Sequence, residues 1–322
     1  MLKTPQFWNH SYGISQALRP FSWLYTKVSS WRESRIKSVK VDVPVLCVGN
    51  LVMGGAGKTP TVVALVEILK TMGHTPHILS RGYGGYFKDA ILVDLNLHSY
   101  LQVGDEPLLL ANIAPTWIGS DRIESARAAI KAGASILVMD DGLQNPSIYK
   151  DFSLIVIDSI QGLGNHLVFP AGPLREPIQK GLTRAEVLIM IGDGPAPLHK
   201  NNTIMQLSAK LTCEGPFTPQ PVVAFAGIGF PDKFRHTLDH HNYIVREFIP
   251  FADHHPYTIT DLQRLSRIAE QHACELITTV KDQLRLPNEY REQVQVLPVQ
   301  LRFSDVQKIQ TILSTKFPVL NR

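Results

Sequence analysis

A glycine-rich stretch between a short apolar run and a helical pattern constrains this chain more than any other feature. Residues 44–48 are typical of a strand, and residues 61–70 repeat apolar side chains at helical spacing. Between them lies Gly54-Gly55-Ala56-Gly57-Lys58-Thr59. A strand, a glycine-rich loop, Gly-Lys-Thr and a helix follow one another in the P-loop, where backbone amides cradle phosphates at the start of a helix. The stretch therefore predicts a nucleoside-triphosphate site.

Two side chains of this loop have predicted roles. Lys58 is expected to reach the β- and γ-phosphates, and the Thr59 hydroxyl is expected to bind Mg²⁺. The loop residues expected to bind the nucleotide are Val52, Met53, Gly54, Gly55, Ala56, Gly57, Lys58 and Thr59. Val52 departs from the usual pattern, which has glycine there, so an ordinary glycine turn before a helix is the alternative. The preceding strand and the Gly-Lys-Thr-Pro sequence favour the phosphate site.

An acidic pair supplies the second half of such a site. Residues 135–139 form an apolar run that ends in Asp140 and Asp141. A buried strand that delivers a carboxylate to the carboxyl edge of the sheet can place it beside the metal. Many strands end in an acid, so the pair indicates a metal site only in combination with the glycine-rich loop that precedes it in the sequence.

The surrounding pattern predicts the fold class. Strand-like runs at 76–80 and 153–157 alternate with helical patterns such as 121–131. Such alternation is typical of an α/β protein with a doubly wound, mostly parallel sheet of the P-loop NTPase type.

Two further segments carry charged candidates. Asp105 opens a helical run at 108–113, where an acid usually caps the helix, although it could also act as a general base. Residues 170–177 are rich in proline and predicted to lie on the surface. There Arg175 could neutralise a moving phosphoryl group and Glu176 could complete a magnesium shell. A solvated ion pair is the alternative.

The C-terminal part reads as a second α/β unit. Residues 195–220 are irregular and polar and are predicted to connect two domains, and a new strand and glycine turn follow at 221–229. His254 precedes a helical run at 259–271. It could belong to a metal site, although adjacent histidines lack ligand spacing, or to a capping loop, or it could orient an acid across a cleft.

The N-terminal segment is basic and amphipathic. Residues 1–40 carry seven basic residues against Glu33, a net charge of +6, whereas the whole chain of 322 residues carries +4. One predicted helical face holds Phe21, Leu24, Tyr25, Val28 and Trp31, with Trp8 and Trp23 nearby. Two interpretations of this helix are open: it lies in the interface of an anionic membrane, or it packs on the domain.

Composition limits the setting of the protein. The segment lacks the apolar core and cleavage site of a signal peptide, and no run of eighteen apolar residues is present. Three widely spaced cysteines lack metal spacing and predict reduced packing residues in a cytosolic compartment. The predicted division is an amphipathic membrane-associating segment at 1–40, a P-loop domain at 41–215 and a smaller α/β domain at 216–322. The resemblance described next implies that the P-loop domain is a kinase domain and that the smaller domain closes over its active site.

Taken together, the motifs closely resemble the tetraacyldisaccharide 4'-kinase family, the lipid A 4'-kinases of Gram-negative bacteria. The motifs occur in the order given below, and the resemblance covers about residues 5–300. The motifs are Gly49-Asn50, Gly54-Gly55-Ala56-Gly57-Lys58-Thr59-Pro60, Ser80-Arg81-Gly82-Tyr83-Gly84, Gly104-Asp105-Glu106-Pro107, Asp140-Asp141-Gly142-Leu143-Gln144, Pro170-Ala171-Gly172-Pro173-Leu174-Arg175-Glu176 and Ala252-Asp253-His254. Val280 departs from the family, which usually has Glu before Lys281-Asp282.

The resemblance implies transfer of the ATP γ-phosphoryl group to the 4'-hydroxyl of an acylated glucosamine disaccharide 1-phosphate, forming lipid IVA. ATP and Mg²⁺ are the implied cofactors. The implied partners are the lipid and the cytoplasmic face of the inner membrane, with peripheral or monotopic attachment and no nucleic acid.

The same resemblance implies residue roles. Lys58 and Thr59 handle the phosphates and the metal, and Asp105 acts as base with help from His254. The residues implied around magnesium are Asp140, Asp141 and Glu176. Gln144 and Arg175 line the site.

Two other classes of protein remain as alternatives at this stage. A nucleotide switch or metallochaperone would bind GTP, whose base-reading Asn-Lys-x-Asp motif has only residues 279–282 as a distant counterpart. An ATP-dependent ligase of a small acid would need no amphipathic segment, so deletion of residues 1–35 separates it from the lipid kinase.

Overall fold

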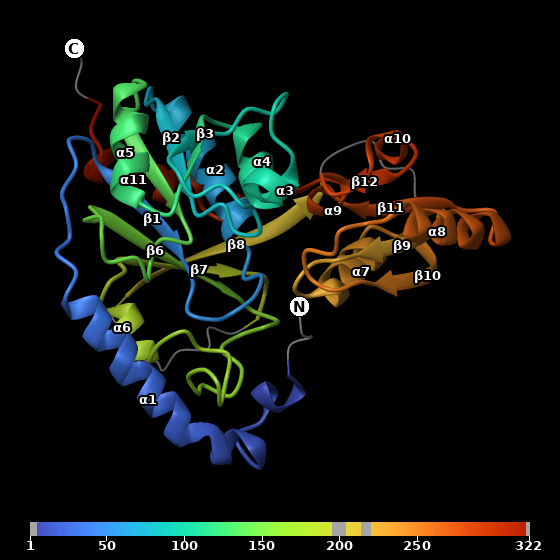
Figure 1. Cartoon of the computed structure of the whole chain (residues 1–322), viewed down its shortest axis with the longest axis horizontal. Coiled ribbons are helices and arrows are strands. Elements are labelled where there is room, and N and C mark those ends of the chain that lie inside the picture. Colours follow the sequence, from blue (N-terminus) through green and yellow to red (C-terminus); the bar gives the residue numbers. More distant parts are fainter. Residues whose placement is uncertain (1–4, 195–203, 214–219, 320–322) are drawn as a thin grey trace.

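The computed structural model describes residues 5–194, 204–213 and 220–319, which build two sheets (Figure 1). In the larger unit the elements are η1 (Gln6–Asn9), α1 (Ile14–Ser34), β1 (Val45–Gly49), α2 (Lys58–Thr71), β2 (Pro76–Ser80), β3 (Ile91–Leu92), α3 (Tyr100–Val103), α4 (Asp105–Ala111), β4 (Thr116–Ile118), α5 (Arg122–Lys131), β5 (Ile136–Asp140), β6 (Phe152–Asp158), α6 (Ile178–Leu182), β7 (Val187–Ile191), β8 (Met205–Cys213), β13 (Val299–Phe303) and α11 (Val306–Lys316). In the smaller unit, residues 220–298, they are β9 (Pro221–Ala226), α7 (Pro231–His240), β10 (Ile244–Pro250), α8 (Ile259–Gln271), β11 (Glu275–Thr279), α9 (Val280–Gln283), α10 (Asn288–Arg291) and β12 (Gln295–Leu297).

The larger sheet has nine strands in the order β13-β8-β7-β6-β1-β5-β2-β4-β3. All neighbours pair in parallel except β3 with β4 and β13 with β8. The central strand β1 is buried at every residue, because helices cover both faces of a doubly wound sheet. The predicted α/β fold with a large, mostly parallel sheet is confirmed.

Alternate residues of the central strands face two separate cores. Leu46 and Val48 pack with the helices α2 and α11, whereas Val45 and Cys47 pack with α5 and α6. Burial on both sides therefore fixes the register of β1, since a slip of one residue would exchange the two faces.

The strand register places the motifs at one edge. Val48 pairs with Asp140 of β5 on one side and with Leu154 of β6 on the other. The carboxyl ends of these parallel strands therefore lie next to each other, at the point where the chain leaves β1 for the glycine-rich loop. Ligands of open α/β sheets bind at such an edge.

The smaller sheet has four parallel strands in the order β10-β9-β11-β12. Two predictions about this region need correction. The segment 195–220, predicted as an irregular connection, contains the nine-residue strand β8; residues 195–203 and 214–219 lie outside the described residues. The range 216–322, predicted as one domain, contains β13 and α11, which belong to the larger unit. Their apolar side chains complete its core, which local sequence does not reveal.

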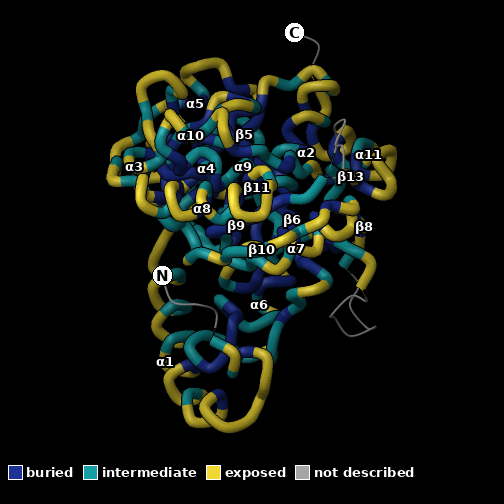
Figure 2. The backbone as a smooth tube through the Cα atoms, turned by 90° about the vertical axis from the view of Figure 1, so that its right-hand side faces the viewer, coloured by how far each residue is buried: buried dark blue, intermediate teal, exposed yellow. Residues whose placement is uncertain are grey.

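Helix α1 packs through small polar residues and exposes apolar ones. Its buried residues are Ser15 and Ser22, and the Ser22 hydroxyl donates to the Val168 carbonyl at 2.6 Å. The exposed apolar set is Phe21 (60% exposed), Trp23 (64%), Leu24 (54%), Val28 (46%) and Trp31 (55%). Figure 2 shows α1 below the body of the molecule, with exposed turns along it. Two residues grouped with this set in the prediction, Trp8 and Tyr25, instead pack against Phe169.

The proline-rich loop at 170–177 is largely buried, contrary to the prediction that it lies on the surface. Residues 171–174 and Glu176 are buried. Ser22 of α1 accepts a hydrogen bond from the Ala171 amide at 3.1 Å, and the Trp8 indole donates to the Pro170 carbonyl at 3.1 Å. The partners that cover the loop come from the N-terminal segment, about 150 residues away in sequence, so local composition could not reveal its burial.

Candidate active site

The glycine-rich loop turns sharply into α2. Gly57 has φ of 84°, and a Cβ there would lie 2.4 Å from the Ile191 Cδ1 atom. Glycine is therefore required at this turn for backbone conformation and for space. Within the described part of the chain, the amides of Gly55, Ala56 and Gly57 donate no hydrogen bond, and Thr59 lies half-buried in the first turn of α2. Free amides at a helix start are suited to an anion.

The beginning of the loop forms hydrogen bonds with the proline-rich loop at 170–177 instead. Val52 is buried, and its carbonyl accepts from the Asn50 side chain at 2.8 Å and from Arg175 Nε at 3.2 Å. The Met53 amide donates to the Pro173 carbonyl at 2.8 Å. These hydrogen bonds fix the path of the loop at Val52 and Met53. Their role in binding the nucleotide stays a prediction.

Asp141 lies between two cations. Its carboxylate accepts from Arg175 Nη1 at 2.9 and 3.0 Å and lies 3.6 Å from Lys58 Nζ. Burial raises the pKa of this carboxyl, but Lys58 and Arg175 outweigh burial, so the pKa lies below its usual value. Three residues predicted for the phosphate and metal site are thus brought together.

Asp140 is buried and incompletely paired. Its Oδ1 atom has no hydrogen-bond partner, and burial, Glu106 and Asp141 raise the pKa of the carboxyl to about 7. An orphaned buried carboxylate oxygen beside two other acids fits a divalent cation, because Mg²⁺ in phosphoryl-transfer sites uses one or two carboxylates together with substrate phosphates. Among the described residues, no group of three His, Cys, Asp or Glu is arranged as a complete metal cage. The donor set therefore fits magnesium that shares its shell with phosphate and water.

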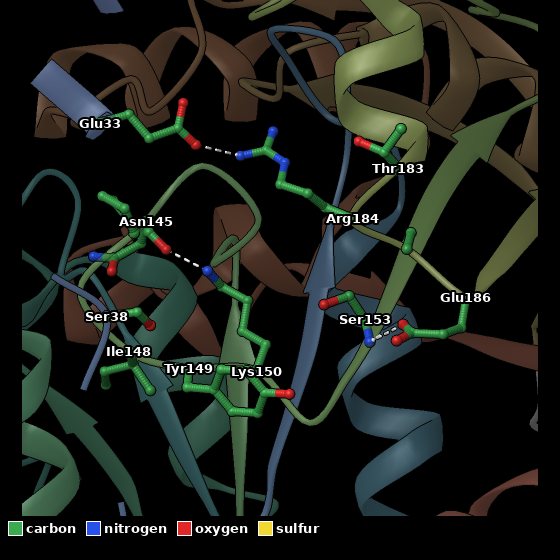
Figure 3. Close-up of a pocket in the computed structure, with 12 residues that line it drawn as sticks. Glu33, Ser38, Asn145, Ile148, Tyr149, Lys150, Ser153, Thr183, Arg184 and Glu186 are labelled. Atoms are coloured by element: carbon green, nitrogen blue, oxygen red, sulfur yellow. Dashed lines mark hydrogen bonds and ion pairs between the residues drawn. The ribbon is translucent and has the colours of Figure 1, made fainter. Parts of the chain in front are cut away.

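Glu176 faces away from this point, toward the end of α1. Its carboxylate pairs with Arg184 and accepts from Gln144 Nε2 at 2.9 Å. Arg184 in turn pairs with Glu33 of α1 at 2.9 Å, which Figure 3 shows as a dashed line. Gln144 also donates to the Asn50 carbonyl at 3.0 Å. The magnesium role of Glu176 and the nucleotide role of Gln144 therefore stay predictions.

The pocket drawn in Figure 3 has a volume of about 390 Å³ and opens beside these groups. Lys150 and Arg184 line it together with Glu33 and Glu186. Lys58, Asp105 and His254 are not among its lining residues. Its cations already pair with Glu33 or the Asn145 carbonyl, so the pocket does not replace the sheet edge as the candidate site.

Asp105 and His254 meet across the boundary between the two units. Asp105 Oδ2 lies 2.9 Å from His254 Nδ1, and Asp105 is only 2% exposed. Burial raises the pKa of Asp105, but the hydrogen bond from His254 and the charges of Lys281 and Arg285 outweigh it, so the pKa lies below its usual value. The carboxyl is therefore ionised near neutral pH and can accept a proton.

The turn before Asp105 explains the motif around it. Gly104 has φ of 92°, and a Cβ there would lie 2.4 Å from the Tyr83 carbonyl oxygen. The Tyr83 ring lies 5.5 Å from the His254 ring. The glycine therefore lets the loop containing Arg81 and Tyr83 approach the start of α4, beside the acid.

Three further residues of the smaller unit contact the larger unit, and local patterns did not predict these contacts. Lys281 pairs with Glu106 at 2.9 Å. Lys233 of α7 pairs with Asp158 at 2.7 Å and donates to the Gly55 carbonyl of the glycine-rich loop at 3.2 Å. Arg285 lies 3.2 Å from Asp105. Each partner lies at least 75 residues away in sequence, so no local spacing could reveal these contacts.

Five of the predicted residues thus form two groups at this edge of the sheet. One group holds Lys58, Asp141 and Arg175 near the loop, and the other holds Asp105 and His254 between the units. Glu106 connects them, since it follows Asp105 directly and lies close enough to raise the pKa of Asp140. A phosphate-binding loop, an ionised buried acid and a facing histidine can transfer a phosphoryl group to a hydroxyl.

Comparisons with known proteins agree on one family. A family model described as "LpxK: Tetraacyldisaccharide-1-P 4'-kinase" matches residues 14–318. The chain is 42% identical to the tetraacyldisaccharide 4'-kinase of Gluconobacter oxydans over 98% of both chains. It is 41% identical to that of Dinoroseobacter shibae over 100% of this chain and 99% of the relative. The crystal structure of LpxK from Aquifex aeolicus in complex with ATP superposes with a TM-score of 0.78 at 27% identity, covering 95% of this chain and all of that one.

Proposed function

Because this chain belongs to the tetraacyldisaccharide-1-phosphate 4'-kinase family, we infer that it phosphorylates the 4'-hydroxyl of a tetraacyldisaccharide 1-phosphate at the expense of ATP. The product is the bisphosphorylated lipid of lipid A biosynthesis, and the chain is a phosphotransferase with an alcohol acceptor. The observation that carries this function is the contact of 2.9 Å between Asp105 and His254 at the sheet edge that holds Lys58.

In the mechanism we propose, the loop holds the triphosphate. The amides of Gly55, Ala56 and Gly57 bind phosphate oxygens, and the Lys58 ammonium group neutralises the β- and γ-phosphates. Arg175, which is held by the Val52 carbonyl at 3.2 Å, stabilises negative charge on the phosphoryl group as it moves. Charge stabilisation of this kind is usually the largest contribution to phosphoryl transfer.

The acceptor hydroxyl is activated from the other part of the site. Asp105 takes the proton of the 4'-hydroxyl while the oxygen attacks the γ-phosphorus. The bond from this phosphorus to the oxygen that bridges the β- and γ-phosphates breaks, and ADP leaves with that oxygen. His254 donates to Asp105 Oδ2 through Nδ1 and so orients the carboxylate. Thr59, Asp140 and Asp141 would hold Mg²⁺, and Glu176 would join them on leaving Arg184. The ion, when bound, neutralises charge on the β- and γ-phosphates.

A direct assay tests this function. Purified protein is incubated with Mg²⁺, ATP and the acylated glucosamine disaccharide 1-phosphate, and the lipid is analysed by mass spectrometry. We expect a gain of one phosphate at the 4'-position, dependent on Lys58. Release of ADP without any phosphorylated lipid would contradict the function and favour a nucleotide-driven switch.

We also propose that the exposed face of α1 lies in the surface of an anionic membrane, on the cytoplasmic side where ATP is available. In the part of the chain that the structure describes, no helix is long and apolar enough to cross a bilayer. Phe21, Leu24, Val28 and Trp31 share a helical face and are each at least 46% exposed. Arg35 stacks on Trp31 at 4.0 Å, and such a pair is suited to the headgroup region.

Vesicle binding tests the membrane proposal. The variant L24E/V28E removes two apolar contacts and adds two charges that an anionic surface repels, at about 1 kcal/mol each. We expect at least a tenfold loss of flotation with vesicles of anionic phospholipid and unchanged ATP affinity. The matched control I259E/V306E changes two exposed apolar residues at the starts of α8 and α11. Equal flotation of both variants would contradict the proposal.

A further inference from the structure

Arg285 is the largest fully buried side chain among the described residues, with 1% exposure. A buried guanidinium group is costly unless its donors are satisfied. Nη1 donates to the His255 carbonyl at 3.1 Å, and Nη2 donates to the Gly227 carbonyl at 2.8 Å and to Asp282 at 2.5 Å. These three partners belong to the smaller unit, so the unit already neutralises and holds this arginine by itself.

One contact of Arg285 leaves its own unit. Its Nε atom lies 3.2 Å from Asp105 Oδ2, the same oxygen that faces His254. Asp282 is fully engaged, because Tyr257, the Gly227 amide and Thr279 also donate to it at 2.6–2.9 Å. The positive charge of Arg285 is therefore shared between Asp282 and the acid across the boundary.

Arg285 also holds the backbone that carries His254. The Gly227 carbonyl accepts from both Arg285 Nη2 and the His254 amide, the latter at 3.1 Å. His254 has φ of 56°, a conformation that side chains rarely adopt and that surrounding contacts must stabilise. Arg285 fixes those contacts on both sides, through Gly227 and through the His255 carbonyl.

We propose that Arg285 is a positioning residue for phosphoryl transfer, which holds the Asp105 carboxylate and the loop of His254 in one arrangement from inside the smaller unit. This inference rests on the proposed role of Asp105 as base. Through Arg285, the acid and the histidine keep their alignment only while the two units are docked. A displacement of about 1 Å in such a pair can cost about 10²-fold in rate.

The test uses the full chain with four single variants and one double variant, which combines Arg285→Met with Asp105→Asn. Arg285→Met removes the charge and all hydrogen-bond donors of the side chain. Arg285→Lys keeps the charge but loses the planar guanidinium group, which donates to several acceptors at once. Arg291→Met is the matched control, because among the described residues Arg291 donates only to the Leu284 and Leu286 carbonyls of its own unit. Asp105→Asn is the reference for loss of the base. Steady-state kcat, KM for ATP and the pH profile of kcat/KM are measured for each.

The expected result separates positioning from folding. Arg285→Met should lose about 10²-fold in kcat with little change in KM for ATP. The groups that face Asp105 are His254, Arg285, Lys281 and Glu106, and loss of the arginine charge should move the acidic limb of the profile to higher pH. Arg285→Lys should keep the limb in place and recover part of kcat. Adding Arg285→Met to Asp105→Asn should cause little further loss, because both act on one group.

Several outcomes would overturn the inference. A wild-type kcat and pH profile in Arg285→Met would do so, as would a loss no larger than that of Arg291→Met, or full additivity with Asp105→Asn. If Arg285→Met does not fold, Arg285→Lys decides, with about a tenfold fall in kcat expected and a wild-type kcat overturning the inference. Normal turnover in Asp105→Asn would instead remove the proposed base itself.

Discussion

The substitution Asp105→Asn tests the base most directly, because it keeps the size of the side chain and removes its charge. Asp105 Oδ2 faces His254 at 2.9 Å and Arg285 at 3.2 Å, and Oδ1 accepts from the Glu106 amide at 2.9 Å. An asparagine offers one oxygen and one amide group, so it can serve only one of these two sides. It cannot accept the proton of the sugar hydroxyl.

The expected loss in rate follows from the role of the group. Positioned general bases contribute about 10²–10⁴-fold. At about 1.4 kcal/mol per tenfold, this corresponds to about 3–5 kcal/mol of transition-state stabilisation. The cost in folding should be smaller, about 1–3 kcal/mol for one buried donor left unpaired. Arg285 remains neutralised by Asp282 at 2.5 Å, so the variant should still fold.

The assay must separate these two effects. Initial rates of lipid phosphorylation give kcat at saturating ATP, calorimetric titration gives ATP affinity, and a thermal melt reports folding. We expect a fall in kcat of at least about 10²-fold with ATP affinity retained, since the glycine-rich loop is untouched. A folded variant whose kcat lies within about threefold of the wild-type value would refute the assignment of Asp105.

Other substitutions test separate parts of the structure. Lys58→Ala should reduce both lipid phosphorylation and slow ATP hydrolysis by about 10²–10³-fold, and an unchanged rate would exclude the cradle from the mechanism. His254→Ala removes the hydrogen bond that most lowers the pKa of Asp105, so that pKa should rise, and the acidic limb of kcat/KM should move to higher pH; an unmoved limb would contradict the pairing. The same sign applies to stability, since an acid with a depressed pKa stabilises the fold above its unfolded pKa and loses that effect as pH falls through the folded value. Asp121→Ala removes the acceptor of the Ile123 amide at 2.8 Å at the start of α5 and should cost about 1 kcal/mol in a urea melt with kcat unchanged; an unchanged stability would show that this cap is dispensable.

Local patterns predicted the central elements well. The strand β2 at Pro76–Ser80 and the helix α8 at Ile259–Gln271 have the predicted ends, because apolar periodicity and an N-cap at Thr258 are properties of neighbouring residues. The strand β8 was missed, since its exposed residues alternate with buried ones in a polar segment. The ends of the smaller unit were also misplaced, because β13 resembles any short strand and only its pairing with β8 assigns it to the larger sheet.

The candidate site was predictable where one motif supplies several groups. Lys58 and Asp141 follow paired strands, and the order of motifs resembled a known family, so both sides of the phosphate site were expected. The alternative in which Asp105 only caps α4 could not be rejected locally, because its partner His254 lies 149 residues away. Arg285 and Arg184 carry no motif, and their importance lies in buried contacts that exist only after the chain has folded.

The antiparallel pairing of β8 with β13 has an architectural consequence. The chain leaves the larger sheet after Cys213 and re-enters it at Val299. These two residues are partners in the antiparallel pairing of β8 with β13. The smaller unit is thus an insertion whose two ends lie side by side, at neighbouring strands of the larger sheet. A short hairpin turn grafted between Cys213 and Val299 should yield a miniature protein that retains the nucleotide loop but has lost His254 and every other group supplied from the inserted segment.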